Sequence, residues 1–222
     1  MLRIEDRRPL LALLALCVGA VGLWFLGAAI TQRIRHAYLL WNLVLAVVPL
    51  AFALGIEILA GRRLYGWALA LGIPWLLFLP NAPYILTDFI HLQRSHSNWA
   101  WIYLLLLVWF SFAGLASGIL SMHLVHRIVT ERLGSALGWL FVGGTSLLTG
   151  LGVALGRFQR WNSWDVLHQP GKIVADLFQH LPFQPLSFES LVSTGIGAFF
   201  GFAYLLFWTL RHPHPTPQNS PA

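Results

Sequence analysis

The sequence has few charged residues and almost no cysteine. Charged residues make up only 10% of the 222 positions, and Cys17 is the single cysteine. A soluble domain carries about 25% charged residues, so this composition excludes an ordinary soluble protein. One cysteine also excludes an intramolecular disulfide and a metal site built from several cysteines.

Apolar residues take the place of the missing charge. They form 57% of the chain, and the mean hydropathy is +0.68. Segments long enough to cross about 30 Å of hydrocarbon, at about 1.5 Å per helical residue, lie near 10–30, 39–59, 64–80, 99–122, 136–155 and 191–210. We therefore predict an all-α fold, a polytopic membrane helix bundle of about six transmembrane helices.

The two ends of the chain complete the predicted organisation. The first apolar segment is longer than the core of about 7–15 residues that a signal peptide has, so it is expected to stay as a helix. We predict one integral membrane domain over residues 1–211. The segment 212–222 is rich in Pro, Ser, Gln and Asn and is expected to be a disordered tail.

The basic residues predict orientation in the membrane. The net charge is +6, but arginines lie before and between the apolar segments, where they anchor a membrane protein, so no nucleic-acid partner is predicted. Eight Lys and Arg residues fall on the side of the termini and six on the other. This excess predicts cytoplasmic termini in a plasma membrane.

Two polar strings interrupt the apolar sequence, at residues 81–91 (NAPYILTDFIH) and 156–165 (GRFQRWNSWD). Both lie in the longer predicted loops, and an even number of crossings separates them, so both are expected on one membrane face. Ionisable and amide groups at a membrane edge need protein or water as partners. The strings therefore predict a joint site on the face opposite the termini.

The first string suits proton transfer or ligand binding. Asn81 can satisfy backbone groups freed by the flanking prolines, or present its amide to a ligand. Asp88 and His91 are three residues apart and share one helical face, so the carboxylate could orient the imidazole for general acid–base catalysis. The same pair could instead be a helix cap and an interfacial histidine.

The second string suits recognition of an anion. Arg157 and Arg160 are spaced for one helical face and can each donate a bidentate fork to phosphate or carboxylate. The neighbouring tryptophans could stack on a ligand or anchor the loop at the interface. Alternatively, an arginine pairs with Asp88 and only locks the fold.

These residues form the predicted site. The catalytic candidates are Asp88, His91 and Asp165, and the ligand-binding candidates are Asn42, Asn81, Arg157, Arg160, Trp161, Asn162 and Trp164. Asp165-x-x-His168 repeats the Asp88-x-x-His91 spacing, but this pattern is short, so no metal site is predicted and the cofactor is left open. Apolar positions between Ile173 and Leu181 predict an amphipathic helix on the membrane that could cover the site.

Paired glycines predict how the helices pack. Gly114 and Gly118, Gly134 and Gly138, Gly152 and Gly156, and Gly197 and Gly201 are each four residues apart. Small residues at this spacing let helix backbones approach closely in lipid. We expect these faces to pack within one bundle rather than to form a dimer.

The strings also resemble a known family. Trp41-Asn42-Leu43, the segment 79–88 and the string 156–165 are similar to strings of a bacterial family of multi-pass membrane proteins classed as a domain of unknown function. The resemblance implies bacterial origin and membrane residence, and it carries no reaction.

Three functions fit the sequence. The leading hypothesis is an enzyme, or an accessory factor, acting on a lipid or envelope precursor, with the bilayer and an anionic lipid headgroup as partners. The alternatives are a small-molecule transporter and a non-catalytic scaffold subunit. The oligomeric state is left open.

Overall fold

The computed structural model describes residues 8–32, 34, 36–94, 99–180 and 187–211, and within these ranges every regular element is a helix. Six spans are long and apolar enough to cross a membrane. The predicted fold class is therefore confirmed, whereas the predicted tail 212–222 lies outside the described residues. The elements are α1 (Arg8–Thr31), α2 (Tyr38–Gly61), α3 (Tyr65–Phe78), α4 (Asn81–Tyr84), η2 (Ile85–Arg94), α5 (Ala100–Leu133), α6 (Ser135–Ala154), η3 (Leu155–Gln159), α7 (Asp165–His168), α8 (Pro170–His180) and α9 (Phe188–Arg211).

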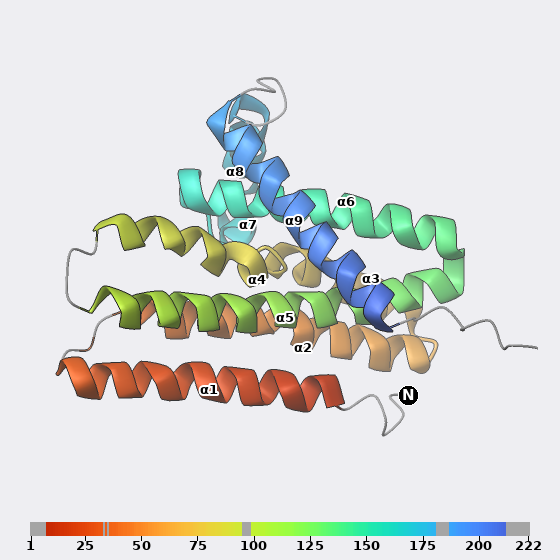
Figure 1. The fold of residues 1–222 in the computed structure, drawn as a ribbon. Coiled ribbons are helices and arrows are strands. Elements are labelled where there is room, and N and C mark those ends of the chain that lie inside the picture. The colour runs from red at the N-terminus through yellow and green to blue at the C-terminus, as the bar shows by residue number, and fades with distance from the viewer. Residues whose placement is uncertain (1–7, 33, 35, 95–98, 181–186, 212–222) are drawn as a thin grey trace, which may run out of the picture.

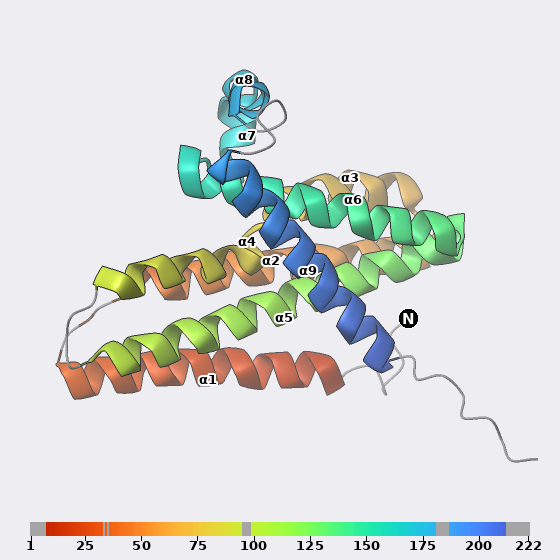
Figure 2. The same ribbon diagram turned by 45° about the horizontal axis from the view of Figure 1, so that its top comes forward.

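Helix α5 is the centre of the bundle. It packs against α1, α2, α4, η2, α6 and α9, and α1 runs alongside it while α9 crosses the bundle obliquely (Figures 1 and 2). Helix α1 begins and α9 ends at the same end of the bundle (Figure 1). The outer side of α1 exposes Leu11, Leu14 and Val18, as a lipid-facing helix requires.

The third span is broken rather than short. Helix α3 ends at Phe78, and after a turn the chain continues as α4 and the 3₁₀ helix η2. Pro83 lies inside the first turn of α4, where the missing N–H of proline leaves no hydrogen bond unmade. The string 81–91 is therefore helical and packs against α2 and α5, contrary to the predicted loop.

Helix α6 ends in an irregular turn that starts the second string. Residues Leu155–Gln159 form a π-helix, and Arg160 follows in the left-handed conformation with φ 60°. The chain then forms the short helix α7 and α8, which stand away from the bundle (Figure 2). Helix α8 confirms that the last long loop contains a short helix, and its position at the membrane interface stays a prediction.

Close approaches at glycine support the predicted packing within the chain. A Cβ on Gly152 would collide with the ring of Pro80, and one on Gly118 would collide with Ala82. Such contacts are how small residues bring membrane helices together. Gly134 is an exception: its φ is 89° and it separates α5 from α6, so it shares no helical face with Gly138.

Candidate functional site

The two polar strings meet through an ion pair. Arg157 Nη1 lies 3.3 Å from Asp88 Oδ1 and donates a hydrogen bond to it. The Asp88 side chain is 4% exposed and the Arg157 side chain is 19% exposed. The predicted contact between the strings is confirmed, and of the two arginines that could pair with Asp88 it is Arg157 that does so. The two strings belong to two different spans, so this contact also places the ends of those spans on the same membrane face.

A second helix joins the pair. Asn42 near the start of α2 donates a hydrogen bond from Nδ2 to Asp88 Oδ2 at 3.2 Å. Each carboxylate oxygen thus has its own donor, which offsets part of the cost of removing the charge from water. Asp88 is a junction of α2, η2 and the end of α6.

Two tyrosines and a histidine beside this junction were missed by sequence reasoning. The Tyr38 and Tyr103 hydroxyls are 2.8 Å apart, and the His36 ring stacks on the Tyr103 ring at 3.9 Å. Both tyrosines are close enough to Asp88 and Arg157 to interact electrostatically with them. The only sequence signal was an aromatic residue at the end of each span, which is also what interfacial anchoring produces.

Asn81 joins the strings at a second point. Its Nδ2 donates to the Phe78 carbonyl at 2.9 Å and to Ser163 Oγ at 3.0 Å. The first bond satisfies a carbonyl at the end of α3, where the helix breaks. The second bond fixes residues 161–164 over the break. Asn81 therefore satisfies a backbone group at the helix break, as predicted, and it also links the two strings.

The remaining polar residues of the second string are held locally. Asp165 Oδ2 accepts hydrogen bonds from the Asn162 backbone N–H at 2.7 Å and from Asn162 Nδ2 at 3.2 Å. Trp161 Nε1 donates to Asp176 Oδ2 at 2.8 Å, which ties α8 to the string. The two catalytic candidates Asp165 and Asp88 are thus engaged with different partners.

Arg157 and Arg160 point to different surroundings. Arg157 lies in the π-helix and is paired with Asp88. Arg160 is exposed: its backbone N–H donates to the Leu155 carbonyl, and its guanidinium has no hydrogen-bond or ion-pair partner among the described residues. The expectation of one shared helical face is wrong, because the π-helix and the left-handed Arg160 change the helical spacing. Arg160 is left as the cation that can meet a ligand.

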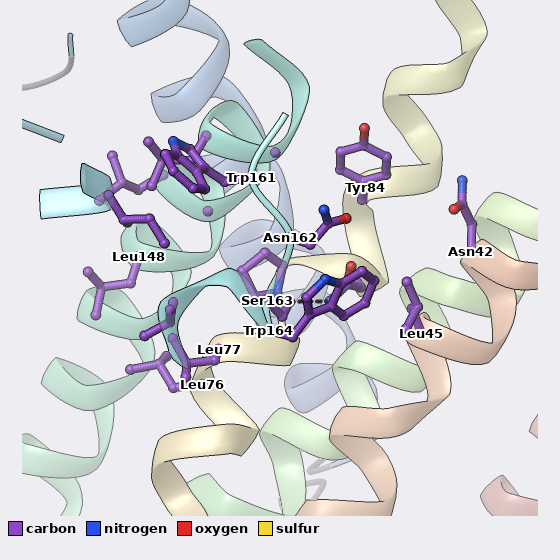
Figure 3. A pocket seen from close by; sticks show the side chains of 18 of the residues that line it. Asn42, Leu45, Leu76, Leu77, Tyr84, Leu148, Trp161, Asn162, Ser163 and Trp164 are labelled. Atoms are coloured by element: carbon purple, nitrogen blue, oxygen red, sulfur yellow. Dashed lines mark hydrogen bonds between the residues drawn. The ribbon is translucent and has the colours of Figure 1, made fainter. Parts of the chain in front are cut away.

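An apolar groove of about 320 Å³ lies beside the junction (Figure 3). Leu76 and Leu77 of α3 face Leu148 and Leu151 of α6 across it, and Trp41, Asn42 and residues 161–164 line its polar end. Figure 3 shows Trp164, Ser163 and Asn162 lying over this end, next to Tyr84. Pro80 and Gly152 hold α3 and α6 together at one point, and the leucines leave a space beside it.

A polar pocket continues from the groove. It is an open space of about 590 Å³ lined by Tyr84, Gly156, Arg157, Arg160 and Asn162. Tyr84, Gly156 and Asn162 also line the groove, so the two spaces share a wall. A molecule with an apolar chain and a polar head matches an apolar groove that opens into a polar pocket.

The described residues do not bring together three His, Cys, Asp or Glu side chains that could hold a metal ion. The backbone of His91 lies in η2, and its side chain falls outside the described part of the chain. The roles of His91 and Asp165 in catalysis stay predictions.

Six apolar spans, an exposed apolar surface and a polar site at one end define a multi-pass membrane protein. The chain belongs to DUF1361, a protein family of unknown function, whose model matches residues 41–204. That range contains the groove, both strings and the Asn42–Asp88–Arg157 junction. No curated protein and no solved structure matches the chain.

Proposed function

We propose that this protein binds an anionic amphiphile, a lipid or a lipid-linked envelope precursor, and acts on it as an enzyme or as an accessory to one. The observation that carries the proposal is the shared wall between the apolar groove and the arginine-bearing pocket. The apolar chain would lie between α3 and α6, and the anionic head would lie over Arg160 and Asn162.

The chemistry of the lining supports this arrangement. Leucines on both helices offer a surface that an acyl or prenyl chain can cover without unpaired polar groups. A guanidinium at the membrane edge offers a planar donor fork to a phosphate. Trp164, which is 36% exposed and lines the groove, is placed where the chain meets the head.

Asp88 serves this site as a positioning residue. It is 3% exposed, and its carboxylate oxygens are engaged by Asn42 and Arg157. Holding Arg157 fixes the turn from which Arg160 and Asn162 extend. A location in a bacterial plasma membrane, with this face outward, is part of the proposal.

Native mass spectrometry of the detergent-purified chain tests the binding. The probes are phosphatidylglycerol and phosphatidylcholine with identical acyl chains. Wild-type protein should retain phosphatidylglycerol in preference. Arg160→Gln should weaken that retention about tenfold, the effect of losing one charge-assisted hydrogen bond. Lys172→Gln is the matched control, because Lys172 is exposed on α8 and lies outside the lining of both spaces.

The groove is tested separately. Leu148→Trp should block it and lower retention of both lipids, whereas Leu140→Trp, on an exposed position of the same helix, should not. Equal retention by the Arg160→Gln and Lys172→Gln proteins, or by the two tryptophan variants, would refute the proposal. Lipid profiling of a strain that lacks the gene, complemented with wild type, Arg160→Gln or His91→Ala, then identifies the lipid class and tests the enzyme.

A scaffold is the second candidate function, and self-pairing within the strings favours it. Asn81, Trp161 and Asn162 each bond to another residue of the chain. In a scaffold these bonds only hold the loops in place. Normal complementation by the Arg160→Gln and Leu148→Trp variants would support that function.

A further inference from the structure

Polar residues also gather at the opposite end of the bundle, where α5 and α9 end and α6 begins. His126 is only 4% exposed. Glu57 of α2 pairs with Arg127 of α5. Helix α5 continues to Leu133, so His126 and Arg127 lie on a helix of the bundle rather than in a loop.

Buried polar atoms at this end include His126 Nε2 and Thr130 Oγ1, which have no hydrogen-bond partner in the described part of the chain and lie one helical turn apart on α5. The other ring nitrogen, His126 Nδ1, is 2.6 Å from the Tyr204 hydroxyl. When that hydroxyl donates to Nδ1, Nε2 carries the hydrogen and becomes a donor. A buried donor without an acceptor destabilises the fold, and a ligand that accepts its hydrogen bond removes that cost.

His126 and Thr130 help to line a cavity of about 370 Å³. Trp139 and Trp208 form an aromatic wall, with their rings 5.1 Å apart, and Arg211 lies at the edge. Position 138 of α6 is glycine, so α6 packs against Thr130 Oγ1 and His126 Nε2 with its backbone, where a Cβ would collide with them. Trp139 of α6 lies edge-on to the His126 ring, with the ring centroids 5.0 Å apart. The cavity therefore combines neutral donors, a guanidinium and aromatic rings.

The charge of this end favours an anion. Among the described residues it has six arginines, Arg8, Arg62, Arg63, Arg127, Arg132 and Arg211, against two carboxylates, Glu57 and Glu131. Both carboxylates lie within 4.0 Å of Arg127. The other arginines keep the surroundings of the cavity positive.

We propose that this cavity is a second ligand site, which binds a phosphate group at the membrane face opposite the first site. Phosphate oxygens are acceptors, and they match the hydrogens of His126 Nε2, the Thr130 hydroxyl and the Arg211 guanidinium. The phosphate can belong to a lipid headgroup or be free in solution, since both present the same oxygens. The site stands independently of the groove and of Arg160.

Two measurements on the full-length purified chain test the site. Native mass spectrometry compares phosphatidylglycerol with phosphatidylcholine, and thermal unfolding in detergent compares sodium phosphate with sodium chloride at equal ionic strength. Arg211→Gln and Thr130→Val should each lower the affinity for phosphatidylglycerol or for inorganic phosphate about tenfold, as expected when one hydrogen-bond donor is lost. Thr130→Val keeps the shape of the side chain and removes only the hydroxyl.

Arg132→Gln is the matched control. Arg132 is on the same face but lies over the Tyr65 ring at 4.3 Å, outside the cavity. An effect with the lipid alone supports a headgroup, and an effect with inorganic phosphate supports a soluble ligand. Equal results for the Arg211→Gln and Arg132→Gln proteins, or no effect of Thr130→Val, would overturn the site. Arg160→Gln lowers phosphatidylglycerol retention at the first site, but on that background the difference between Arg211→Gln and Arg132→Gln should persist, so failure here is separate from failure of the first proposal.

Discussion

Replacing Asp88 with asparagine should destabilise the fold, because it removes the charge that Arg157 faces. The substitution keeps the size of the side chain, and one amide oxygen can still accept a bond from Asn42. What it removes is the negative charge 3.3 Å from Arg157 Nη1. A guanidinium whose side chain is 19% exposed is then left without its counter-charge.

The size of the effect follows from burial. Breaking a buried ion pair by removing one partner costs about 3–5 kcal/mol. Arg157 keeps some access to solvent, and part of its desolvation cost can be relieved, so we expect about 2–3 kcal/mol. For a chain of about 150–250 residues, that lowers Tm by about 4–12 °C.

The assay is the fraction of monodisperse protein that remains after heating in detergent, measured by size-exclusion chromatography. Glu131→Gln is the control, because it makes the same chemical change at a pair 3.9 Å apart in which Glu131 is 66% exposed. An exposed pair contributes about 0–1 kcal/mol. Adding Arg157→Gln to Asp88→Asn should restore part of the loss, since no unpaired charge is then buried.

A Tm for the Asp88→Asn protein within error of the Glu131→Gln protein would refute this reasoning. So would strictly additive losses in the double variant, because partners in one ion pair must show coupling. Either result would mean that the junction does not hold the strings together. Asp88 would then be free to serve a purely chemical role.

Two further predictions concern packing and topology. Gly152→Leu should sharply lower folded yield, because even a Cβ there collides with the facing helix break, whereas Gly143→Leu, with nothing within 4 Å of the added atom, should not. Comparable yields would show that the α3–α6 contact is dispensable. On a Cys17→Ala background, an impermeant thiol reagent should label cysteines at Gln169 and Ser135 from opposite sides of the membrane. Labelling of both from one side would contradict the six-span topology.

The spans could be predicted from sequence because hydropathy acts locally: any 20 apolar residues in a row must meet lipid or protein. The same reasoning failed for Pro80 and Pro83, which stop one helix but start the next. Whether a proline ends a helix or begins one depends on the chain around it. Here Ala82 packs against Gly118, which only tertiary structure reveals.

The site was predictable to the level of the strings and one ion pair. Opposite charges confined to one membrane edge have few partners, which is why Asp88 and Arg157 could be matched. Tyr38 and Tyr103 could not, because 65 residues separate them and each looks like an interfacial anchor. The pair of Glu57 and Arg127 is beyond sequence reasoning for a similar reason, because 70 residues separate the two.

The π-helix at Leu155–Gln159 has a consequence for how the chain tolerates changes in length. A π-turn is an α-turn with one residue inserted, and each residue of an α-helix turns the chain by about 100°. Deleting one residue from this turn would leave α6 intact and every side chain type present, but Arg157 would face another direction. The junction with Asp88 therefore depends on the count of residues between Gly152 and Arg157 as strictly as on their identity. A homologue that keeps the aspartate and the arginine but lacks one residue of this turn would carry both charges without the hydrogen bond between them.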